Sequence, residues 1–411
     1  MTTALAPRRT HRRMKVALLS YDFGEYCTRL ASGLAQEAQV CLLLPHQLVE
    51  PHLSKLDQTV NFQPFCKPRL RQPLLQIRTI CTILRRIRNF DPDVLHVQQG
   101  HFWFNLALPL LARYPLVLTI HDPRHHLGDR GSNKTPQTIL DFGFRCADQV
   151  VVHGHQLKQV VVHRLRIPNE IVHVIPQVGV WHDAAGNQIQ EDDHLILFFG
   201  RIWEYKGLDY LIRAEPLITA QVPDARIIIA GRGEDFSRYR DMMVHPEHFI
   251  VHNEYVSEDK RAELFRQASI VALPYIDASQ SAVIPLAYAF AKPVVATAVG
   301  GLPEMVDHGS TGYIVPPRDE GALAGAIVSL LTDKQLRRQM GANGKRKVDT
   351  ECSPNVVAQQ TLAVYRCAIN GIRMSADGRE PDSPYGAIVQ SSADDCLSPE
   401  PTPTHSSRRR Q

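Results

Sequence analysis

The sequence predicts an α/β protein built from two doubly wound domains. Three observations lead to this prediction. The chain has 411 residues, which is more than one ordinary hydrophobic core accommodates. Short apolar runs alternate with amphipathic stretches, the order typical of parallel strands joined by right-handed helical crossovers. The alternation stops once, at the polar stretch 181–194, and then begins again, so we place the hinge between the two domains there.

Apolar runs predict the elements of the first domain, which we place at residues 14–182. Short runs rich in branched apolar residues, without polar alternation, indicate buried parallel strands. Such runs occupy residues 15–20, 40–44, 94–98, 116–120, 149–152 and 171–175. Apolar residues at helical spacing fill the connections, at residues 26–35, 72–89, 102–113 and 156–165. This order is that of a parallel sheet with helices on both faces.

The same pattern returns in the second domain, which we place at residues 183–353. Strands are predicted at residues 195–200, 226–230, 270–273 and 293–297. Helices are predicted at residues 208–218, 259–267, 282–291, 320–331 and 334–347, and a last helix follows at about residues 354–370.

Both ends of the chain differ in composition from the two domains. Residues 371–411 are rich in Ser, Pro, Asp and Arg, and residues 1–13 are basic, so we expect both segments to be disordered. The sequence "MKVALLS" enters the first strand directly. Met14 is therefore an expected alternative to Met1 as the start residue.

Composition and charge narrow the function classes. The 44% hydrophobic and 21% charged content is typical of a globular protein. Residues 1–190 carry 22 basic and 13 acidic side chains, a net +9, whereas the remainder carries −5. This asymmetry favours an anionic partner such as a membrane surface, a phosphate-bearing substrate or nucleic acid, and an ordinary solvated surface explains it equally well. The eight cysteines form no C-x-x-C pair, which indicates reduced core thiols.

The sequence also bears on location and on macromolecular partners. No apolar run approaches the ~20 residues of a membrane span, and the run after the basic start is too short for a secretory signal, so we expect a cytoplasmic protein. The Arg-rich helix 72–89 leaves two interpretations open. It contacts the inner face of an anionic membrane, or it is an ordinary helix packed on the sheet with its cations outward. No nucleic-acid partner is expected, because aromatic residues are not interleaved with the basic ones.

A candidate anion site lies in "LFFGRIWEYKGLDYLIRA" (197–214). A strand ends at Gly200, and the following loop carries Arg201 and Lys206 before a helix. Two cations beside a glycine turn and a helix N-terminus form a suitable clamp for a diphosphate. An ordinary loop with exposed charges gives the same pattern. The next strand is followed by Gly231 and Gly233, a glycine pair that many nucleotide-binding folds share but that falls short of a dinucleotide fingerprint.

A polar triplet precedes the apolar helix in "YIDASQSAVIPLAYAFAKPVVATAVGGLPE" (275–304). We predict that Ser281 is the N-cap and that Pro285 lies in the first turn, where its missing N–H costs little. Capping alone would not explain Gln280. The N–H groups, hydroxyls and amide at this helix start would bind anionic oxygens. The predicted diphosphate-binding residues are therefore Gly200, Arg201, Lys206, Ser279, Gln280, Ser281, Ala282 and Val283.

Histidines follow apolar strands in the first domain, as in "LVLTIHDPRHHLGD" (116–129). His121 and Asp122 come at the carboxyl end of a predicted strand. His121 can donate a hydrogen bond to a sugar or accept a proton, with Asp122 orienting it or binding hydroxyls. A structural His-Asp turn is the alternative. His125 and His126 are close in sequence, but no ligand spacing supports a metal site.

Together these motifs resemble the retaining glycosyltransferases of family four, which have the GT-B fold of two Rossmann-like domains facing a central cleft. The resemblance covers most of residues 14–370. It is carried by "TIHD", "GRIWEYKGLDYLIRA", "IIIAGRGE", "ASIVALPY" and "AKPVVATAVGGLPEMVDHGSTGYIVPP". It implies that the second domain binds a sugar nucleotide, that the first binds the acceptor, and that the last helix crosses back onto the first domain.

The resemblance also implies roles for single residues. Arg201 and Lys206 match the diphosphate-binding pair of the family, and His121 matches a histidine near the transferred sugar. The residues implied to lie near the nucleoside are Gly231, Tyr255 and Val256.

One feature departs from the family pattern. The family usually carries two glutamates, separated by seven residues, around the helix 282–291. Alignment through "KPVVAT" places Ala278 and Leu286 at these positions. Asp277 stands next to the first, whereas the second carboxylate, which usually binds the ribose hydroxyls, is absent. The segment closely resembles a subgroup with an "ASQSGVIPLAYAF"-like helix.

We therefore expect a retaining hexosyltransferase that moves a sugar from a nucleoside diphosphate sugar to a glycan or lipid-linked glycan. We expect catalytic roles for His121, Asp122 and Asp277. Because Arg201, Lys206 and the helix start at 281–283 would stabilise the departing diphosphate, we expect no metal and no cofactor. Two alternatives stay open. The missing glutamates are compatible with a catalytically impaired sugar-nucleotide-binding relative, and the fold is compatible with a nucleotide-sugar epimerase.

Overall fold

The structure, a computed structural model, describes residues 12–125, 135–179 and 190–377. The chain divides into two units, Met1–Ile369 and Asn370–Gln411, and the fold described below is that of the first unit. Most of the predicted basic start, most of the predicted hinge and residues 378–411 of the predicted tail lie outside the described residues. Helix α14 (Pro354–Asp377) extends past the predicted boundary at residue 370.

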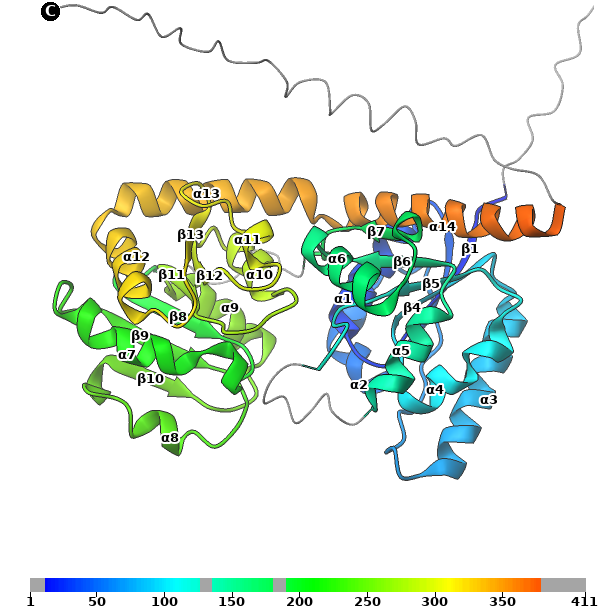
Figure 1. The fold of residues 1–411 in the computed structure, drawn as a ribbon, viewed down its shortest axis with the longest axis horizontal. Helices are drawn as coiled ribbons and strands as arrows, with labels where there is room; N and C mark the ends of the chain where they lie inside the picture. Colours follow the sequence, from blue (N-terminus) through cyan, green and yellow to red (C-terminus); the bar gives the residue numbers. More distant parts are fainter. Residues whose placement is uncertain (1–11, 126–134, 180–189, 378–411) are drawn as a thin grey trace, which may run out of the picture. The chain divides into compact units, whose positions relative to one another are not determined.

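The first half of the chain forms a sheet of seven parallel strands (Figure 1). The strand order is β3-β2-β1-β4-β5-β6-β7, in which the chain moves outward from β1 in one direction and from β4 in the other. This is the order of a doubly wound fold. The strands are β1 (Lys15–Ser20), β2 (Gln39–Leu43), β3 (Asn61–Phe62), β4 (Val94–Gln99), β5 (Leu116–Thr119), β6 (Gln149–Val152) and β7 (Val172–Val174).

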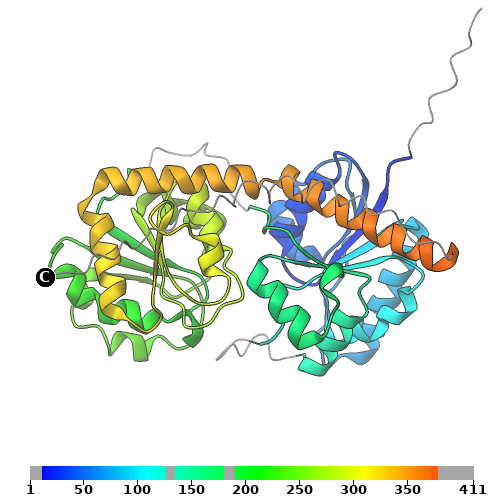
Figure 2. The same cartoon turned by 45° about the horizontal axis from the view of Figure 1, so that its top comes forward.

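Helices cover both faces of this sheet, because alternate residues of β1 point to opposite faces. Val16 and Leu18 pack with α1 and α14 in one hydrophobic cluster, and Ala17 and Leu19 pack with α3 and α4 in another. Helix α14, orange in Figure 2, thus contributes to the core of the first domain. The other helices here are α1 (Gly24–Leu34), α2 (His46–Val49), α3 (Pro73–Phe90), α4 (Phe102–Ala107), α5 (Gln137–Arg145) and α6 (His155–Leu165).

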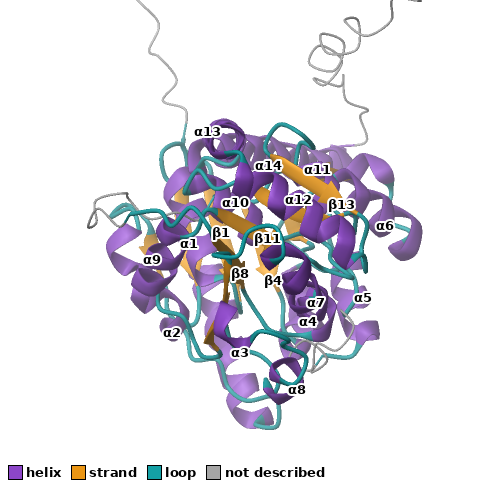
Figure 3. Cartoon of the chain, turned by 90° about the vertical axis from the view of Figure 1, so that its left-hand side faces the viewer, coloured by secondary structure: helices purple, strands orange, loops and turns teal. Residues whose placement is uncertain are grey.

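The second half forms a sheet of six parallel strands in the order β10-β9-β8-β11-β12-β13. Ile196 and Phe198 of its strand β8 pack with α7 and α12, whereas Leu195 and Leu197 pack with α9 and α10. Figure 3 shows strands on the inside and helices outside. The strands are β8 (Leu195–Phe199), β9 (Arg226–Ala230), β10 (Phe249–His252), β11 (Ile270–Leu273), β12 (Val294–Thr297) and β13 (Gly312–Val315). The helices are α7 (Leu208–Thr219), α8 (Ser237–Arg240), α9 (Glu258–Gln267), α10 (Val283–Ala289), α11 (Leu302–Met305), α12 (Glu320–Thr332) and α13 (Lys334–Glu351).

The predicted fold class, two doubly wound parallel-sheet domains, is confirmed. The strands that sequence analysis missed, β3, β10 and β13, all lie at sheet edges. An edge strand pairs on one side only and packs less of its surface, so its apolar signal is weak. In β10 every residue is half-buried.

Two helix predictions need correction. The single helix predicted at 102–113 is a short α4 followed by a 3₁₀ helix at Leu108–Leu111. Pro109 lies in that 3₁₀ helix, and its missing N–H removes the hydrogen bond that would continue an α-helix. In α3, the apolar residues at helical spacing are not all packed on the sheet: Ile80, Ile83 and Leu84 are buried, but Leu75 is 46% exposed.

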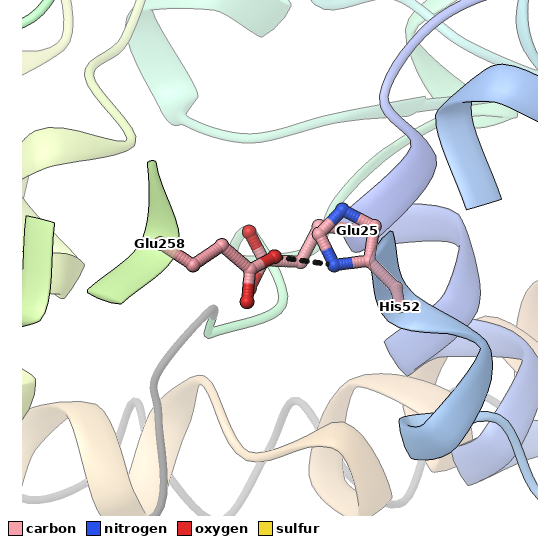
Figure 4. Close-up of side chains that lie close together, drawn as sticks. All are labelled: Glu25, His52 and Glu258. Atoms are coloured by element: carbon pink, nitrogen blue, oxygen red, sulfur yellow. Dashed lines mark ion pairs between the residues drawn. The ribbon is translucent and has the colours of Figure 1, made fainter. Parts of the chain in front are cut away.

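An ion-pair cluster joins the two halves within this unit. Arg261 on α9 donates from both terminal nitrogens to the Glu25 carboxylate on α1, at 3.1 and 3.2 Å. Glu258, also on α9, accepts from Lys55 Nζ at 2.7 Å and lies 2.6 Å from His52 Nδ1. Figure 4 shows Glu25, His52 and Glu258 converging. His52 and Lys55 belong to the 3₁₀ helix Glu50–Lys55.

Among the described residues, none of the helices combines the length and the apolar composition needed to cross a bilayer.

The bidentate Arg261–Glu25 pair predicts a measurable contribution to stability. Both side chains are largely buried, at 16% and 13% exposure. Arg261→Met would leave the Glu25 carboxylate without this partner, so we expect the free energy of unfolding to fall by about 1 to 2 kcal/mol, measured by urea denaturation.

Arg113→Met is the matched control. It breaks an Arg113–Asp91 pair of 2.7 Å whose side chains are 61% and 65% exposed, and we expect a change within about 0.5 kcal/mol. Equal changes in the two variants would contradict a special role for the Arg261 pair.

Candidate functional site

The loop after β8 holds the two predicted cations against aromatic rings. Gly200 ends the strand, with a φ of 123°. The Arg201 guanidinium donates to the Tyr205 hydroxyl at 2.9 Å. Lys206, at the end of the 3₁₀ helix Glu204–Lys206, places Nζ 3.7 Å from the centre of the Tyr275 ring. A cation above a ring face is attracted by the ring quadrupole, so the aromatic residues orient this charge.

The start of α10 differs in detail from the sequence prediction. The helix begins at Val283 with Ala282 as N-cap, so the prediction that Ser281 is the N-cap is wrong. The reason is that the Ser281 hydroxyl is held by two groups, the Val283 N–H and the Tyr275 hydroxyl, each at 3.3 Å. These contacts set Ser281 one residue outside the cap. Pro285 is in the first turn, as predicted.

The two predicted halves of the anion site meet. A Cβ placed on Gly200 would lie 3.8 Å from Val283 Cγ2, so the end of β8 and the start of α10 are in van der Waals range. Tyr275 connects the same regions, because its ring faces Lys206 and its hydroxyl contacts Ser281. The convergence on which the sequence interpretation depends is therefore present.

Gln280 and Ser279 face another part of the structure. A Cβ placed on Gly154, just before α6, would lie 2.3 Å from Gln280 Nε2, and one placed on Gly301 would lie 2.1 Å from it. The Gln280 amide nitrogen is buried without a hydrogen-bond partner. Ser279 accepts the Gly301 N–H through its backbone carbonyl at 3.0 Å. The Gln280 side chain thus lies between the N-termini of α6 and α11.

The α6 N-terminus is capped by a carboxylate distant in sequence. Glu304 of α11 accepts the backbone N–H groups of His155 and Gln156, both at 2.6 Å. A carboxylate at a helix N-terminus satisfies orphan N–H groups and interacts favourably with the helix dipole. The sequence analysis did not single out Glu304.

Asp277 lies within the loop between β11 and α10 and is half-buried. Its backbone N–H donates to the Tyr205 carbonyl at 3.3 Å, which fixes it beside the loop of the two cations. Its carboxylate is 4.0 Å from a terminal nitrogen of Arg124, which follows β5.

His121 is buried after β5, in an aromatic surrounding. Its ring stacks on Phe23 at a centroid distance of 4.1 Å and lies 4.8 Å from His153. Its Nε2 is 3.2 Å from Gln98 Oε1. Burial, with a smaller effect of His153, holds the pKa of His121 well below its usual range, so the ring is neutral at pH 7. Asp122 is exposed.

His153 is a candidate site residue that the sequence analysis missed. It is buried after β6, its Nδ1 donates to the Ile175 carbonyl at 2.9 Å, and its Nε2 is buried without a hydrogen-bond partner. Burial lowers the pKa of His153 to about 4. The signal was present in "QVVVHGH", which repeats the pattern of an apolar strand followed by a histidine.

The predicted nucleoside residues follow β9 and β10. Gly231 has a φ of 148°, and a Cβ there would lie 1.8 Å from the Gly200 carbonyl oxygen, so only glycine fits where the two loops approach. The Tyr255 ring is 78% exposed and Val256 is half-buried. The close packing of the backbone therefore explains the glycines at 231 and 233 without reference to a ligand.

Among the described residues, one group has a geometry compatible with a metal ion: Glu25, His52 and Glu258, whose ligand atoms lie within 4.8 Å of one another. Lys55 and Arg261 already pair with its two carboxylates, so the group is explained as an ion-pair cluster. His125 contacts the Thr135 carbonyl at 3.0 Å, and His126 lies outside the described residues.

Comparison with known proteins agrees with this architecture. The family model described as "Glycosyl transferases group 1" matches residues 193–333, and the model described as "Glycosyltransferase Family 4" matches residues 24–177. An uncharacterized glycosyltransferase of Methanocaldococcus jannaschii is 32% identical over 299 residues, covering 67% of this chain and 76% of that protein. A D-inositol 3-phosphate glycosyltransferase of Kribbella flavida is 29% identical over 333 residues, covering 70% and 76%.

Solved structures share the fold. Sucrose-phosphate synthase of Thermosynechococcus elongatus superposes with a TM-score of 0.66 at 18% identity, over 87% of this chain and all of that one. HepE of Anabaena, solved in complex with UDP, gives a TM-score of 0.65 at 17% identity, over 86% of this chain and all of that one. The chain therefore belongs to the family 4 type of glycosyltransferases and is a glycosyltransferase with the GT-B fold.

Proposed function

We propose that this glycosyltransferase moves a hexose, with retention of configuration, from a nucleoside diphosphate sugar to a hydroxyl of a glycan or lipid-linked glycan. The observation that carries the proposal is the meeting of Gly200 with Val283, which brings Arg201 and Lys206 to the start of α10. A diphosphate needs concentrated positive charge and N–H donors, and both are gathered there. The UDP bound to HepE, a structural neighbour, supports this class of donor.

Charge stabilisation at the departing diphosphate is the proposed source of catalysis. Arg201 and Lys206 would neutralise the developing charge, and the segment 279–283 would add hydrogen-bond donors. Preorganised donors at a position where charge develops lower the barrier more than they lower the energy of the bound substrate. With two cations in this role, we propose that the reaction needs no metal ion.

The nucleoside and sugar would occupy the neighbouring loops. The exposed Tyr255 ring offers a face on which a base can stack, beside Val256 and the Gly231 turn. Asp277 would hold sugar hydroxyls. The second family carboxylate has no substitute in α10, because Leu286 is 6% exposed and packs in the core with Ala278. We therefore propose that ribose recognition comes from another element.

His121 and Asp122 would line the sugar pocket from the first domain. The acceptor hydroxyl would attack the anomeric carbon from the face that the diphosphate leaves. The bond from that carbon to the diphosphate oxygen breaks as the bond to the acceptor oxygen forms, and the leaving oxygen takes the acceptor proton. This order retains configuration without a covalent intermediate.

Lys206→Met tests the proposed charge stabilisation. After a thermal-shift screen of UDP-, GDP- and ADP-sugars identifies the donor, release of nucleoside diphosphate is measured. We expect Lys206→Met to lower turnover by about 100-fold, because one charge that stabilises the leaving group is lost. Lys345→Met, which removes an exposed partner of Asp349, is the control and should retain turnover.

Four outcomes test the proposed roles and the alternatives. Unchanged diphosphate release in Lys206→Met would contradict the proposed role of Lys206. A donor that binds without any hydrolysis or transfer would favour the catalytically impaired relative, whereas an epimer formed from donor alone would favour the epimerase. Turnover that disappears with a chelator and returns with a divalent cation would contradict the proposed metal independence.

We also propose that the first turn of α3 contacts an anionic membrane surface. Leu74, Leu75 and Ile77 are 81%, 46% and 52% exposed, and the exposed Arg71 and Arg78 flank them. Exposed apolar side chains beside cations suit the boundary between headgroups and acyl chains. The +9 net charge of residues 1–190 adds electrostatic attraction to such a surface.

Sedimentation with phosphatidylserine-containing vesicles tests this contact. We expect Leu74→Ser combined with Ile77→Ser to lower the bound fraction at least several-fold at low salt, because the apolar side chains no longer enter the membrane. Val244→Ser, which changes a residue 64% exposed in the second half, should have no effect. Absence of binding by the unmodified protein at low salt would remove the proposal.

A further inference from the structure

A buried set of hydrogen-bonding side chains leads from α14 to His121. The Tyr365 hydroxyl of α14 lies 2.6 Å from His96 Nδ1 on β4. The other nitrogen of His96, Nε2, lies 2.8 Å from Thr119 Oγ1 on β5 and 3.2 Å from Gln98 Nε2. Gln98 then turns its carbonyl oxygen to His121 Nε2, at 3.2 Å. Gln98 therefore stands between two histidines.

His96 and His121 are both neutral, so the hydrogen bonds of each ring determine which of its two nitrogens carries the proton. His96 and Gln98 are at most 1% exposed and His121 is 7% exposed. Burial lowers the pKa of His96 to about 3 and holds that of His121 well below its usual range. A neutral imidazole has one N–H and one lone pair, and its hydrogen-bond partners decide which nitrogen carries the proton.

The Gln98 amide fixes these choices. Its NH₂ group can only donate and its oxygen can only accept. With the NH₂ group toward His96, the Nε2 of His96 is the acceptor, and Nδ1–H donates to the Tyr365 hydroxyl. With its oxygen toward His121, the Nε2 of His121 must carry the proton. The Nδ1 atom of His121 then has the lone pair.

We infer that Gln98 is a positioning residue that holds His121 in the Nε2–H tautomer, so that His121 meets its ligand through Nδ1 as a hydrogen-bond acceptor. This inference rests on the proposed function for the identity of the ligand. A lone pair accepts from a sugar hydroxyl and is repelled by a phosphate oxygen. His121 would therefore recognise a hydroxyl of the transferred hexose, and the diphosphate would be left to Arg201 and Lys206.

The position of the proton can be observed without substrate. Protein labelled with ¹⁵N-histidine gives long-range ¹H–¹⁵N correlation spectra that distinguish the two tautomers, and the difference from His121→Asn assigns the ring. We expect His121 of the unmodified protein to be protonated at Nε2. In Gln98→Met, which keeps the length of the side chain and removes its hydrogen bonds to His96, His121 and Tyr26, we expect a mixture of tautomers.

Gln98→Glu is the conservative variant. Its carboxylate still accepts from His121 Nε2–H, so the tautomer should return. The added negative charge should raise the pKa of His121 and move the acidic limb of the kcat/KM profile to higher pH. The groups that already face His121 are His153, Asp122 and His96, with Tyr26 packed edge-on to its ring, and they are unchanged in this variant.

Turnover provides the second measurement. We expect Gln98→Met to lower kcat by about 10- to 100-fold, the effect of a misplaced site group, with thermal stability reported alongside. Thr119→Val also removes a hydrogen-bond partner of His96 but keeps Gln98, so it should leave the His121 tautomer unchanged.

The outcomes distinguish the inference from the proposed function. An Nδ1–H tautomer in the unmodified protein, or an unaltered tautomer in Gln98→Met, would overturn the inference even if the protein transfers sugar. The expected tautomers in a protein that transfers no hexose would overturn the proposed function and leave the hydrogen-bond assignment standing. If Gln98→Met does not fold, the His121 tautomer observed in the spectra of the unmodified protein and of Gln98→Glu still tests the inference.

Discussion

The parallel direction of every strand pair is the constraint on which the rest of this structure depends. Parallel strands have all their carboxyl ends at one edge, so the loops that leave them are gathered there. In the second sheet this edge receives Arg201 and Lys206 from the β8 loop and Tyr275 from the β11 loop. In the first sheet it receives His121 after β5 and His153 after β6. Candidate site residues that are far apart in the sequence therefore lie at the same edge of each sheet.

These loops lie so close together that some of their positions accept only certain residues. The Gly231 turn passes so near the Gly200 carbonyl that a Cβ would lie 1.8 Å from its oxygen. Lys206 lies against Tyr275, whose hydroxyl contacts Ser281, so one aromatic side chain links the cation loop to the start of α10. Leu286 has become part of the hydrophobic core. The position that the family resemblance assigns to a glutamate therefore contributes here to the packing of α10.

These relations explain how far the sequence could predict the molecule. Interior strands such as β1 and β6 were predicted with the bounds they have, because full burial gives an unbroken apolar run. The edge strands β3, β10 and β13 are only partly buried and gave no such run, although the edge strand β7 was predicted. Arg201 and Lys206 could be selected because strand, glycine and cation follow one another along the chain. Gln98 could not, because its importance lies in its contact to His121, which only the pairing of β4 with β5 creates.

The excess positive charge of the first half and the two cations near α10 lie on different parts of the chain. The excess positive charge of the first half does not surround His121, which is buried among neutral histidines and aromatic rings. It lies instead on exposed arginines such as Arg71 and Arg78 of the α3 region. The cations that converge on α10 come from the second half, whose net charge is negative. A nucleoside diphosphate would therefore be bound by two local charges held by tyrosines, and the global charge asymmetry concerns a different surface. Neutral groups would suit the sugar pocket proposed for the first half, because a lone pair recognises a sugar hydroxyl more selectively than a charge that also attracts phosphate.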